Sequence, residues 1–190
     1  MALRRGFKSE ANKYAKEMRV ELGRQSYEPL CPWELARLLE IPILPLSEFS
    51  VSDPRAVSVL SNGAQDKFSA VSVFEGRKRL IVHNDAHHPY RQAANIAHEL
   101  SHAILLHPPT PPFTGDGERN FNSEVRSMEE EANWLGPALL VSEEAALHIV
   151  RNKMSLSFAS EFYTASEQLI TMRINVTGAR KRANRFRGPK

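Results

Sequence analysis

Apolar positions recur every three or four residues at the start of the chain. This spacing runs from Ser9 to Leu22 and predicts an amphipathic helix, because it places the apolar side chains on one face. A second helix is predicted from Pro32 to Leu39, since proline suits the first helical position and two further prolines, at 42 and 45, stop the helix. The chain is therefore expected to begin with a pair of helices.

The next part of the chain alternates β-branched and polar residues. The segments are AVSVLSNG (56–63), KFSAVSVFEG (67–76) and KRLIVHND (78–85). Asn-Gly and Glu-Gly turn signals end the first two segments, which is typical of antiparallel strands. They predict a small, mainly antiparallel sheet.

Helical spacing returns after the predicted sheet. Residues 88–107 predict one long helix that a proline cluster ends, and the segment from Pro108 to Asn122 is expected to be a loop able to cover a site. Further helices are predicted from Ser127 to Leu140, from about Ser142, and on both sides of Thr164, with Ser166 as a cap. The fold class is therefore mixed α+β, with a helical C-terminal extension.

The long helix carries the motif AHELSH (97–102). Residues four apart share one face of a helix, so the imidazoles of His98 and His102 can bind one ion. Glu99 projects about 100° further round the helix, beside the position that a zinc site with three protein ligands leaves open to water. A carboxylate there can act as a general base. The pattern arises by chance in roughly one shuffled sequence in forty, so the hypothesis needs a third ligand.

A third histidine is one source of that ligand. The pattern HExxHxxGxxH fails, because Leu105 and Pro108 occupy its glycine and last histidine positions. His107 lies off this register and is expected to face solvent or to end the helix.

A downstream helix is the other source, because it offers Glu129, Glu130 and Glu131 in succession. We favour Glu129, which shares a helix face with Ala132 and Asn133. The small alanine lets two helices approach, and the asparagine can accept a hydrogen bond from a ligand histidine. The alternative is that the three glutamates form a solvated acidic face.

AHELSH (97–102) together with EEEANWLGPALLVS (129–142) resembles the ImmA/IrrE family of zinc metallopeptidases, in which an AHELGH helix precedes an E-x-E-A-N-x-F-A-x-x-L-L-M-P segment. The resemblance covers about residues 9–142, and TASEQLITMRIN (164–175) is similar to the family's C-terminal helical segment. It departs at Leu135-Gly136, where Phe-Ala is usual, and at Val141-Ser142, where Met-Pro is usual. The resemblance implies a zincin-like fold in which His98, His102 and Glu129 bind Zn²⁺ and Glu99 is the catalytic base and acid.

The same resemblance implies a partner and a task. Many members of the family cleave a helix-turn-helix repressor and so induce genes of a stress response or of a mobile element. Peptide hydrolysis also needs a donor for the oxyanion, for which Tyr163, His148 and His107 are unranked candidates. Two alternatives stay open: a non-catalytic binding module that retains the fold, and a DNA-binding regulator in which zinc is structural.

Composition limits the setting. The single cysteine, Cys31, excludes an intrachain disulfide and a thiolate zinc site, and no apolar run has the length of a membrane span. We therefore expect a cytoplasmic protein with no membrane partner. The net charge of +3 is unevenly placed, since the segment 178–190 has basic residues and no acid. Such a tail is more often a solvated end than a nucleic-acid contact.

These patterns predict a division of the chain into three parts. Residues 1–142 would form the zincin-like metallopeptidase domain, and 143–178 a helical, helix-turn-helix-like extension packed on it. Residues 179–190 would form a basic tail, for which disorder is one expectation.

Overall fold

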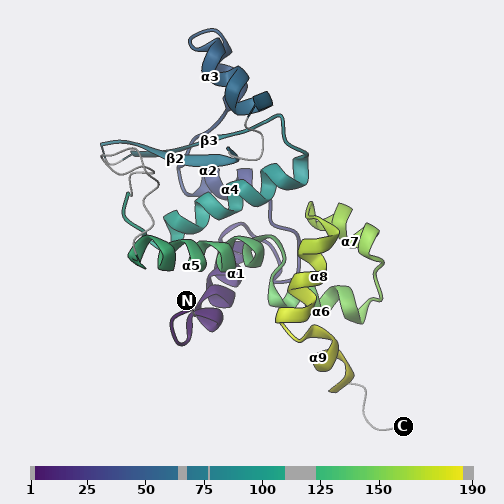
Figure 1. The fold of residues 1–190 in the computed structure, drawn as a ribbon. Helices are drawn as coiled ribbons and strands as arrows, with labels where there is room; N and C mark the ends of the chain where they lie inside the picture. The colour runs from purple at the N-terminus through teal and green to yellow at the C-terminus, as the bar shows by residue number, and fades with distance from the viewer. Residues whose placement is uncertain (1–2, 64–67, 77, 110–122, 186–190) are drawn as a thin grey trace.

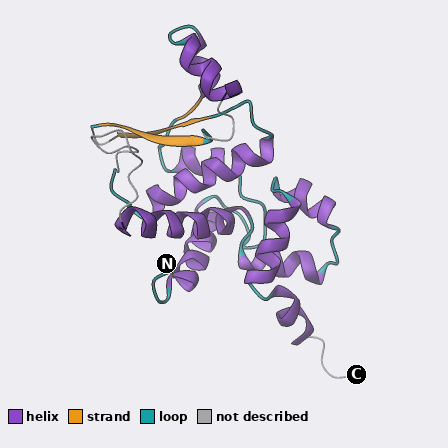
Figure 2. Cartoon of the chain, viewed as in Figure 1, coloured by secondary structure: helices purple, strands orange, loops and turns teal. Residues whose placement is uncertain are grey.

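The computed structural model describes residues 3–63, 68–76, 78–109 and 123–185. Its helices and strands, in chain order, are α1 (Phe7–Glu21), α2 (Pro32–Leu38), β1 (Ile43–Pro45), η1 (Leu46–Ser50), α3 (Pro54–Ser58), η2 (Val59–Gly63), β2 (Ala70–Glu75), β3 (Lys78–His83), α4 (Pro89–Ile104), α5 (Ser123–Leu140), α6 (Glu143–Arg151), α7 (Leu156–Tyr163), α8 (Glu167–Val176) and α9 (Ala179–Arg185). Helix α4 lies between the sheet and helices α1 and α5, while α6 to α9 gather at one end (Figure 1). The described chain is mostly helical, with the strands along one edge, so a mixed α+β fold is confirmed (Figure 2).

The predicted helix pair is present. Helix α1 begins one residue after Gly6, whose φ of 87° is a left-handed conformation that glycine adopts without steric cost. Helix α2 begins with Pro32, where the missing N–H of proline breaks no helical hydrogen bond. The pair precedes the sheet, as the spacing predicts.

The sheet differs from the prediction in two strands, since one predicted strand is absent and β1, which was not predicted, is present. Strands β2 and β3 pair antiparallel, and β1 pairs parallel to β3, which gives the order β1-β3-β2 among the described residues. The predicted strand at 56–63 is wrong, since α3 and the π-helical turn η2 occupy that segment. Asp53 caps α3 by accepting a hydrogen bond from the Ala56 N–H, and Pro54 fills its first position. These start signals outweigh the strand preference of β-branched residues that have no neighbouring strand to pack against.

Helix α4 joins two groups of buried side chains. Its residues Ala93 and Ala97 belong to one buried cluster with residues of α6, α7 and α8, and its residues Ile96 and Leu100 belong to a second with residues of α1, α2, β3 and α5. The helix is therefore held from both sides, which fixes the direction of its remaining, polar face. One buried cluster contains residues of α4 and residues of the C-terminal helices. The predicted domain boundary at residue 142 therefore stays a prediction.

The basic C-terminal segment differs in part from expectation. Residues 179–185 form α9 and not a disordered tail, and Arg182 of this helix forms an ion pair with Glu143 of α6. Among the described residues, no helix is both long and apolar enough to cross a lipid bilayer. The segment from residue 110 to 122, predicted as a covering loop, lies outside the described residues.

Candidate metal centre

Helix α4 places the two motif histidines one turn apart. Ile96 and Leu100 are fully buried, and His98 and His102 each follow one of them by two residues, about 200° round the helix, so the histidines face away from that buried side. The Nε2 atoms of His98 and His102 lie 3.2 Å apart, with ring centroids separated by 4.9 Å. The predicted convergence of the two imidazoles is therefore present.

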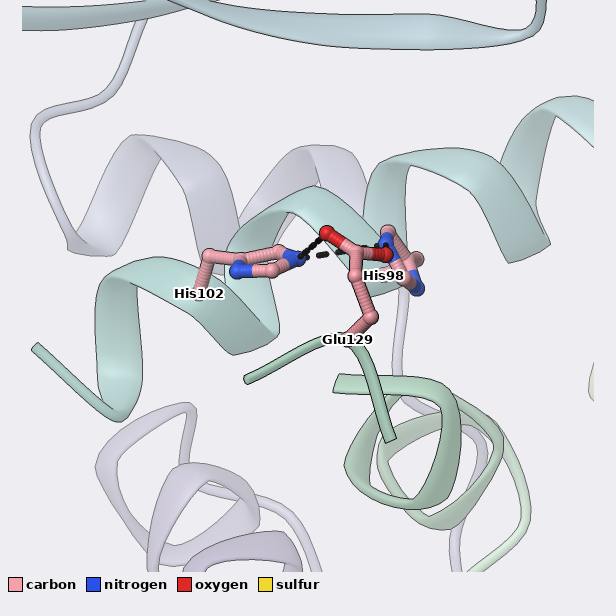
Figure 3. A group of neighbouring side chains, drawn as sticks. All are labelled: His98, His102 and Glu129. Atoms are coloured by element: carbon pink, nitrogen blue, oxygen red, sulfur yellow. Dashed lines mark hydrogen bonds and ion pairs between the residues drawn. The ribbon is translucent and has the colours of Figure 1, made fainter. Parts of the chain in front are cut away.

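Helix α5 supplies the third group. The carboxylate of Glu129 lies between the two imidazoles, with Oε2 at 3.3 Å from Nε2 of His98 and Oε1 at 3.4 Å from Nε2 of His102 (Figure 3). Ala132, one turn further along α5, is fully buried. The structure therefore brings together the three residues that the sequence analysis selected as metal ligands.

The three groups fit a divalent metal ion. Ligand atoms at about 2.0–2.2 Å from a tetrahedral ion lie about 3.3–3.6 Å from one another. The two imidazole nitrogens lie 3.2 Å apart, close to this spacing, and each lies 3.3 or 3.4 Å from one of the two Glu129 oxygens. Among the described residues, His98, His102 and Glu129 form a group able to hold a metal, with one ligand atom from each within 4.8 Å of the others. Two imidazoles and one carboxylate also form a donor set typical of catalytic zinc, and the half-exposed Glu129 side chain shows that one side of the group is open.

Electrostatics distinguish the two histidines. Burial lowers the pKa of His98, but hydrogen bonds to Glu129 and Asn133 and the charges of Glu99 and Glu129 raise it above its ordinary value overall. Burial and then the neighbouring His98 lower the pKa of His102 to about 4. The hydrogen bond from His98 holds the pKa of Glu129 below its ordinary value. Below the pKa of His98, the His98 ring of the metal-free site is therefore protonated beside the Glu129 carboxylate, while His102 stays neutral down to about pH 4.

Glu99 points toward the sheet. Its Oε2 accepts a hydrogen bond of 2.7 Å from the hydroxyl of Ser72 in β2, which crosses α4 at this point. This contact fixes one carboxylate oxygen of the residue that follows the candidate ligand His98. Ser72 was not among the predicted site residues, because a serine in a strand carries no local signal of its tertiary partner.

Glu131 and His107 lie on the other side of the ligands. Glu131 is buried and binds Arg4 and His107, so it is not a member of the metal-binding group. The expectation that His107 faces solvent is wrong, since its side chain is 9% exposed and its Nδ1 lies 2.9 Å from Nδ1 of His102. Its place just beyond the end of α4 does agree with the prediction that it ends the helix.

The other oxyanion candidates belong to the packing of the C-terminal helices. The Tyr163 hydroxyl donates to the backbone carbonyl of Tyr27 at 2.8 Å, and the ring of His148 stacks on the ring of Tyr27 with centroids 4.4 Å apart. Both contacts hold α6 and α7 against the segment before α2. A donor for the oxyanion stays a prediction without an assigned residue.

Comparison with known families identifies the class of protein. Residues 56–175, more than half of the chain, match the family model of a peptidase, M78, described as the IrrE N-terminal-like domain. The chain belongs to this family, which confirms the resemblance to ImmA/IrrE metallopeptidases and agrees with the candidate metal site. No curated protein and no solved structure matches the chain. The matched region begins after α1, α2 and β1, so Arg4 and its neighbours lie outside it.

Proposed function

We propose that this protein is a zinc-dependent endopeptidase that cleaves a partner protein. The observation that carries the proposal is the convergence of His98, His102 and Glu129: the two imidazole Nε2 atoms lie 3.2 Å apart, and each lies 3.3 or 3.4 Å from one oxygen of the Glu129 carboxylate. Glu99 follows His98 directly on the same helix, and its carboxylate is held by Ser72. A purely structural metal site has no need of a carboxylate at this position.

A divalent ion held by these three residues supplies Lewis acidity, which lowers the pKa of water to about 7 and polarises the scissile carbonyl. Zinc is proposed because His, His and Glu are a donor set of zinc peptidases, although iron, cobalt and manganese accept the same ligands. The metal content of the purified protein distinguishes these ions.

Glu99 transfers the proton in this proposal. Its carboxylate takes a proton from the attacking water as the new C–O bond forms at the carbonyl carbon. It then delivers that proton to the amide nitrogen as the C–N bond breaks, which gives a carboxylic acid and an amine, and the acid then ionises. The Ser72 hydroxyl holds Oε2 at 2.7 Å, so the transfer is assigned to Oε1.

The proposed substrate is a helix-turn-helix transcriptional repressor in the cytoplasm, whose cleavage would release stress-response or mobile-element genes. Membership of the IrrE N-terminal-like family supports this choice through the resemblance to ImmA/IrrE proteins. The single cysteine agrees with a reducing compartment.

Three variants test the proposal. Glu99→Gln is expected to bind zinc as the unchanged protein does and to lose cleavage of a helix-turn-helix repressor that the unchanged protein cleaves. His98→Ala and His102→Ala are expected to lose the ion. Glu124→Gln, an exposed position at the start of α5, is the matched control and should retain both properties. Retained cleavage by Glu99→Gln, or a purified protein that binds no divalent metal, contradicts the proposal.

A further inference from the structure

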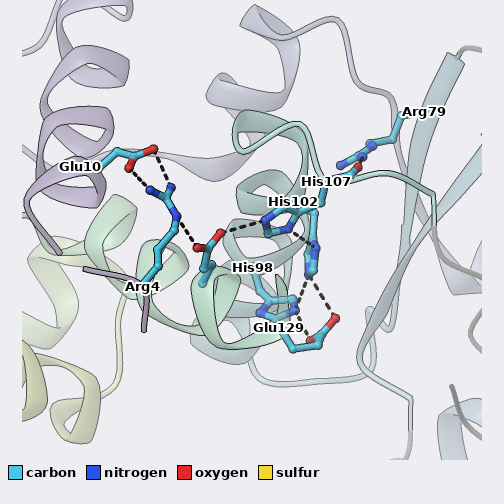
Figure 4. A network of polar contacts seen from close by, with 8 residues as sticks. Arg4, Glu10, Arg79, His98, His102, His107 and Glu129 are labelled. Carbon is cyan, nitrogen blue, oxygen red and sulfur yellow. Dashed lines mark hydrogen bonds and ion pairs between the residues drawn. The ribbon is translucent and has the colours of Figure 1, made fainter. Parts of the chain in front are cut away.

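A line of polar contacts leads away from the back of His102. While Nε2 of His102 faces Glu129, its Nδ1 lies 2.9 Å from Nδ1 of His107. Nε2 of His107 lies 3.2 Å from Oε2 of Glu131, and Oε1 of Glu131 accepts a hydrogen bond of 2.6 Å from Nε of Arg4 (Figure 4). The other side of the Arg4 guanidinium binds Glu10 of α1. The contacts therefore join a candidate metal ligand to the N-terminal segment.

Only one arrangement of protons satisfies every contact once His102 binds a metal through Nε2. The hydrogen of a neutral His102 ring is then on Nδ1, and it is donated to Nδ1 of His107. His107 consequently carries its hydrogen on Nε2 and donates it to Glu131. The carboxylate is an acceptor for His107 with one oxygen and for Arg4 with the other. Each donor has one acceptor, so the line fixes the tautomer of both rings.

The backbone holds His107 where this arrangement requires it. Leu106 adopts φ 54°, a left-handed conformation uncommon for leucine, and its side chain is largely exposed. The turn lets the N–H of His107 donate to the carbonyl of His102 at 2.9 Å, while Arg79 donates to the carbonyl of His107 at 3.2 Å. The exposed side chain of Leu106 does not explain its rare backbone conformation. The contacts of the buried residue that follows it, His107, therefore stabilise this turn.

We propose that His107 and Glu131 are positioning residues that orient His102 as a metal ligand, and that Arg4 anchors Glu131. The inference rests on the proposed function, because it assumes that His102 binds a metal. It goes beyond the family match, since Arg4 and Glu10 lie before the matched residues. An outer hydrogen bond to a ligand histidine fixes its ring and raises its basicity, and loss of such a partner lowers metal affinity about 10- to 100-fold.

The experiment uses the full chain and Co²⁺ as the probe, because its visible absorption spectrum reports ligand geometry. His107→Leu removes both polar contacts, and its dissociation constant for Co²⁺ is expected to rise about 10- to 100-fold, with an altered spectrum at saturation. His107→Gln retains an acceptor and a donor on one side chain and is expected to recover most of the affinity. Glu131→Gln should weaken binding, because its amide cannot accept from both His107 and Arg4. Glu124→Gln, at the exposed start of α5 and outside this line of contacts, is the control.

The outcomes separate this inference from the function on which it rests. If the unchanged protein binds no Co²⁺, the proposed metal site fails. If it binds Co²⁺ and both His107→Leu and Glu131→Gln match its affinity and spectrum, the positioning role is overturned. Circular dichroism and thermal unfolding without metal identify a variant that does not fold. In that case the test uses Arg4→Gln instead, because Arg4 is half-exposed. This variant is expected to lose less affinity for Co²⁺ than the variants at residues 107 and 131. An affinity equal to that of the unchanged protein contradicts the inference.

Discussion

Gly136 of α5 lies directly against the backbone of His98 in α4. A Cβ atom at Gly136 would come within 3.1 Å of both Cα and N of His98, which is closer than such contacts normally occur. The absence of a side chain at this position lets the two helices approach, and Glu129 reaches His98 from the same pair of helices.

The series Gly136→Ala and Gly136→Val is therefore expected to separate α4 from α5 in proportion to side-chain size. Overpacking against backbone lowers the free energy of unfolding by about 1–3 kcal/mol. Replacing glycine by alanine inside a helix raises it by only about 1 kcal/mol. Both the melting temperature and the affinity for zinc should fall, more for valine than for alanine. Glu124→Ala on the exposed start of α5 serves as the control, and unchanged zinc affinity in both Gly136 variants contradicts the expectation.

Ser72 provides a separate test of how Glu99 is held. Ser72→Ala removes the hydrogen bond to Oε2 of Glu99 without touching the metal ligands. We expect kcat to fall about 3- to 10-fold, because one hydrogen bond contributes about 1 kcal/mol, while the affinity for zinc stays the same. Steady-state kinetics and zinc titration measure the two effects. Ser72→Thr retains the hydroxyl and should restore most of the rate; a loss of zinc affinity in Ser72→Ala would assign the residue a structural role instead.

Much of the metal site follows from local rules. The i,i+4 spacing of His98 and His102 on a helix needs no tertiary information, and helical spacing around both histidines predicts α4. Glu129 was chosen over Glu130 and Glu131 because the small residue Ala132 follows it on the same helix face. Ala132 is buried, as a close contact between two helices requires. Helix geometry therefore predicted which three side chains come together.

The remaining features depend on contacts that no local pattern records. Strand β1 has three residues and ends in Pro45, so its length is too short for alternation to be read. The position of His107 depends on the left-handed turn at Leu106, for which leucine is an unexpected residue. Arg4 reaches Glu131 across 127 positions in the chain. These contacts arise only once α1, α4 and α5 are packed together.

The affinity for the metal is expected to fall as the pH is lowered. In the metal-free protein the pKa of His98 lies above its ordinary value, so below that pKa a proton occupies the nitrogen that the ion needs. Binding should therefore release a proton from His98, whereas His102, with a pKa of about 4, is already neutral above pH 5. Calorimetric titrations in buffers of different ionisation enthalpy count the protons released. Equal binding enthalpies in all buffers below pH 7 would show that His98 is already deprotonated.

Arg19 gives a prediction for stability that is independent of the metal. Its side chain is fully buried, and its guanidinium donates to the backbone carbonyls of Ala15, Glu28 and Leu140, the last at the end of α5. Arg19→Met keeps most of the side-chain length but leaves these carbonyls without their donor. We expect the free energy of unfolding to fall by about 2–4 kcal/mol. Arg19→Lys keeps the charge but cannot direct donors toward all three carbonyls, so it should recover only part of the loss. Chemical denaturation of the metal-free protein measures both changes. If Arg19→Met is as stable as the unchanged protein, the contacts of Arg19 merely offset the cost of burying its charge, and the end of α5 is held by apolar packing alone.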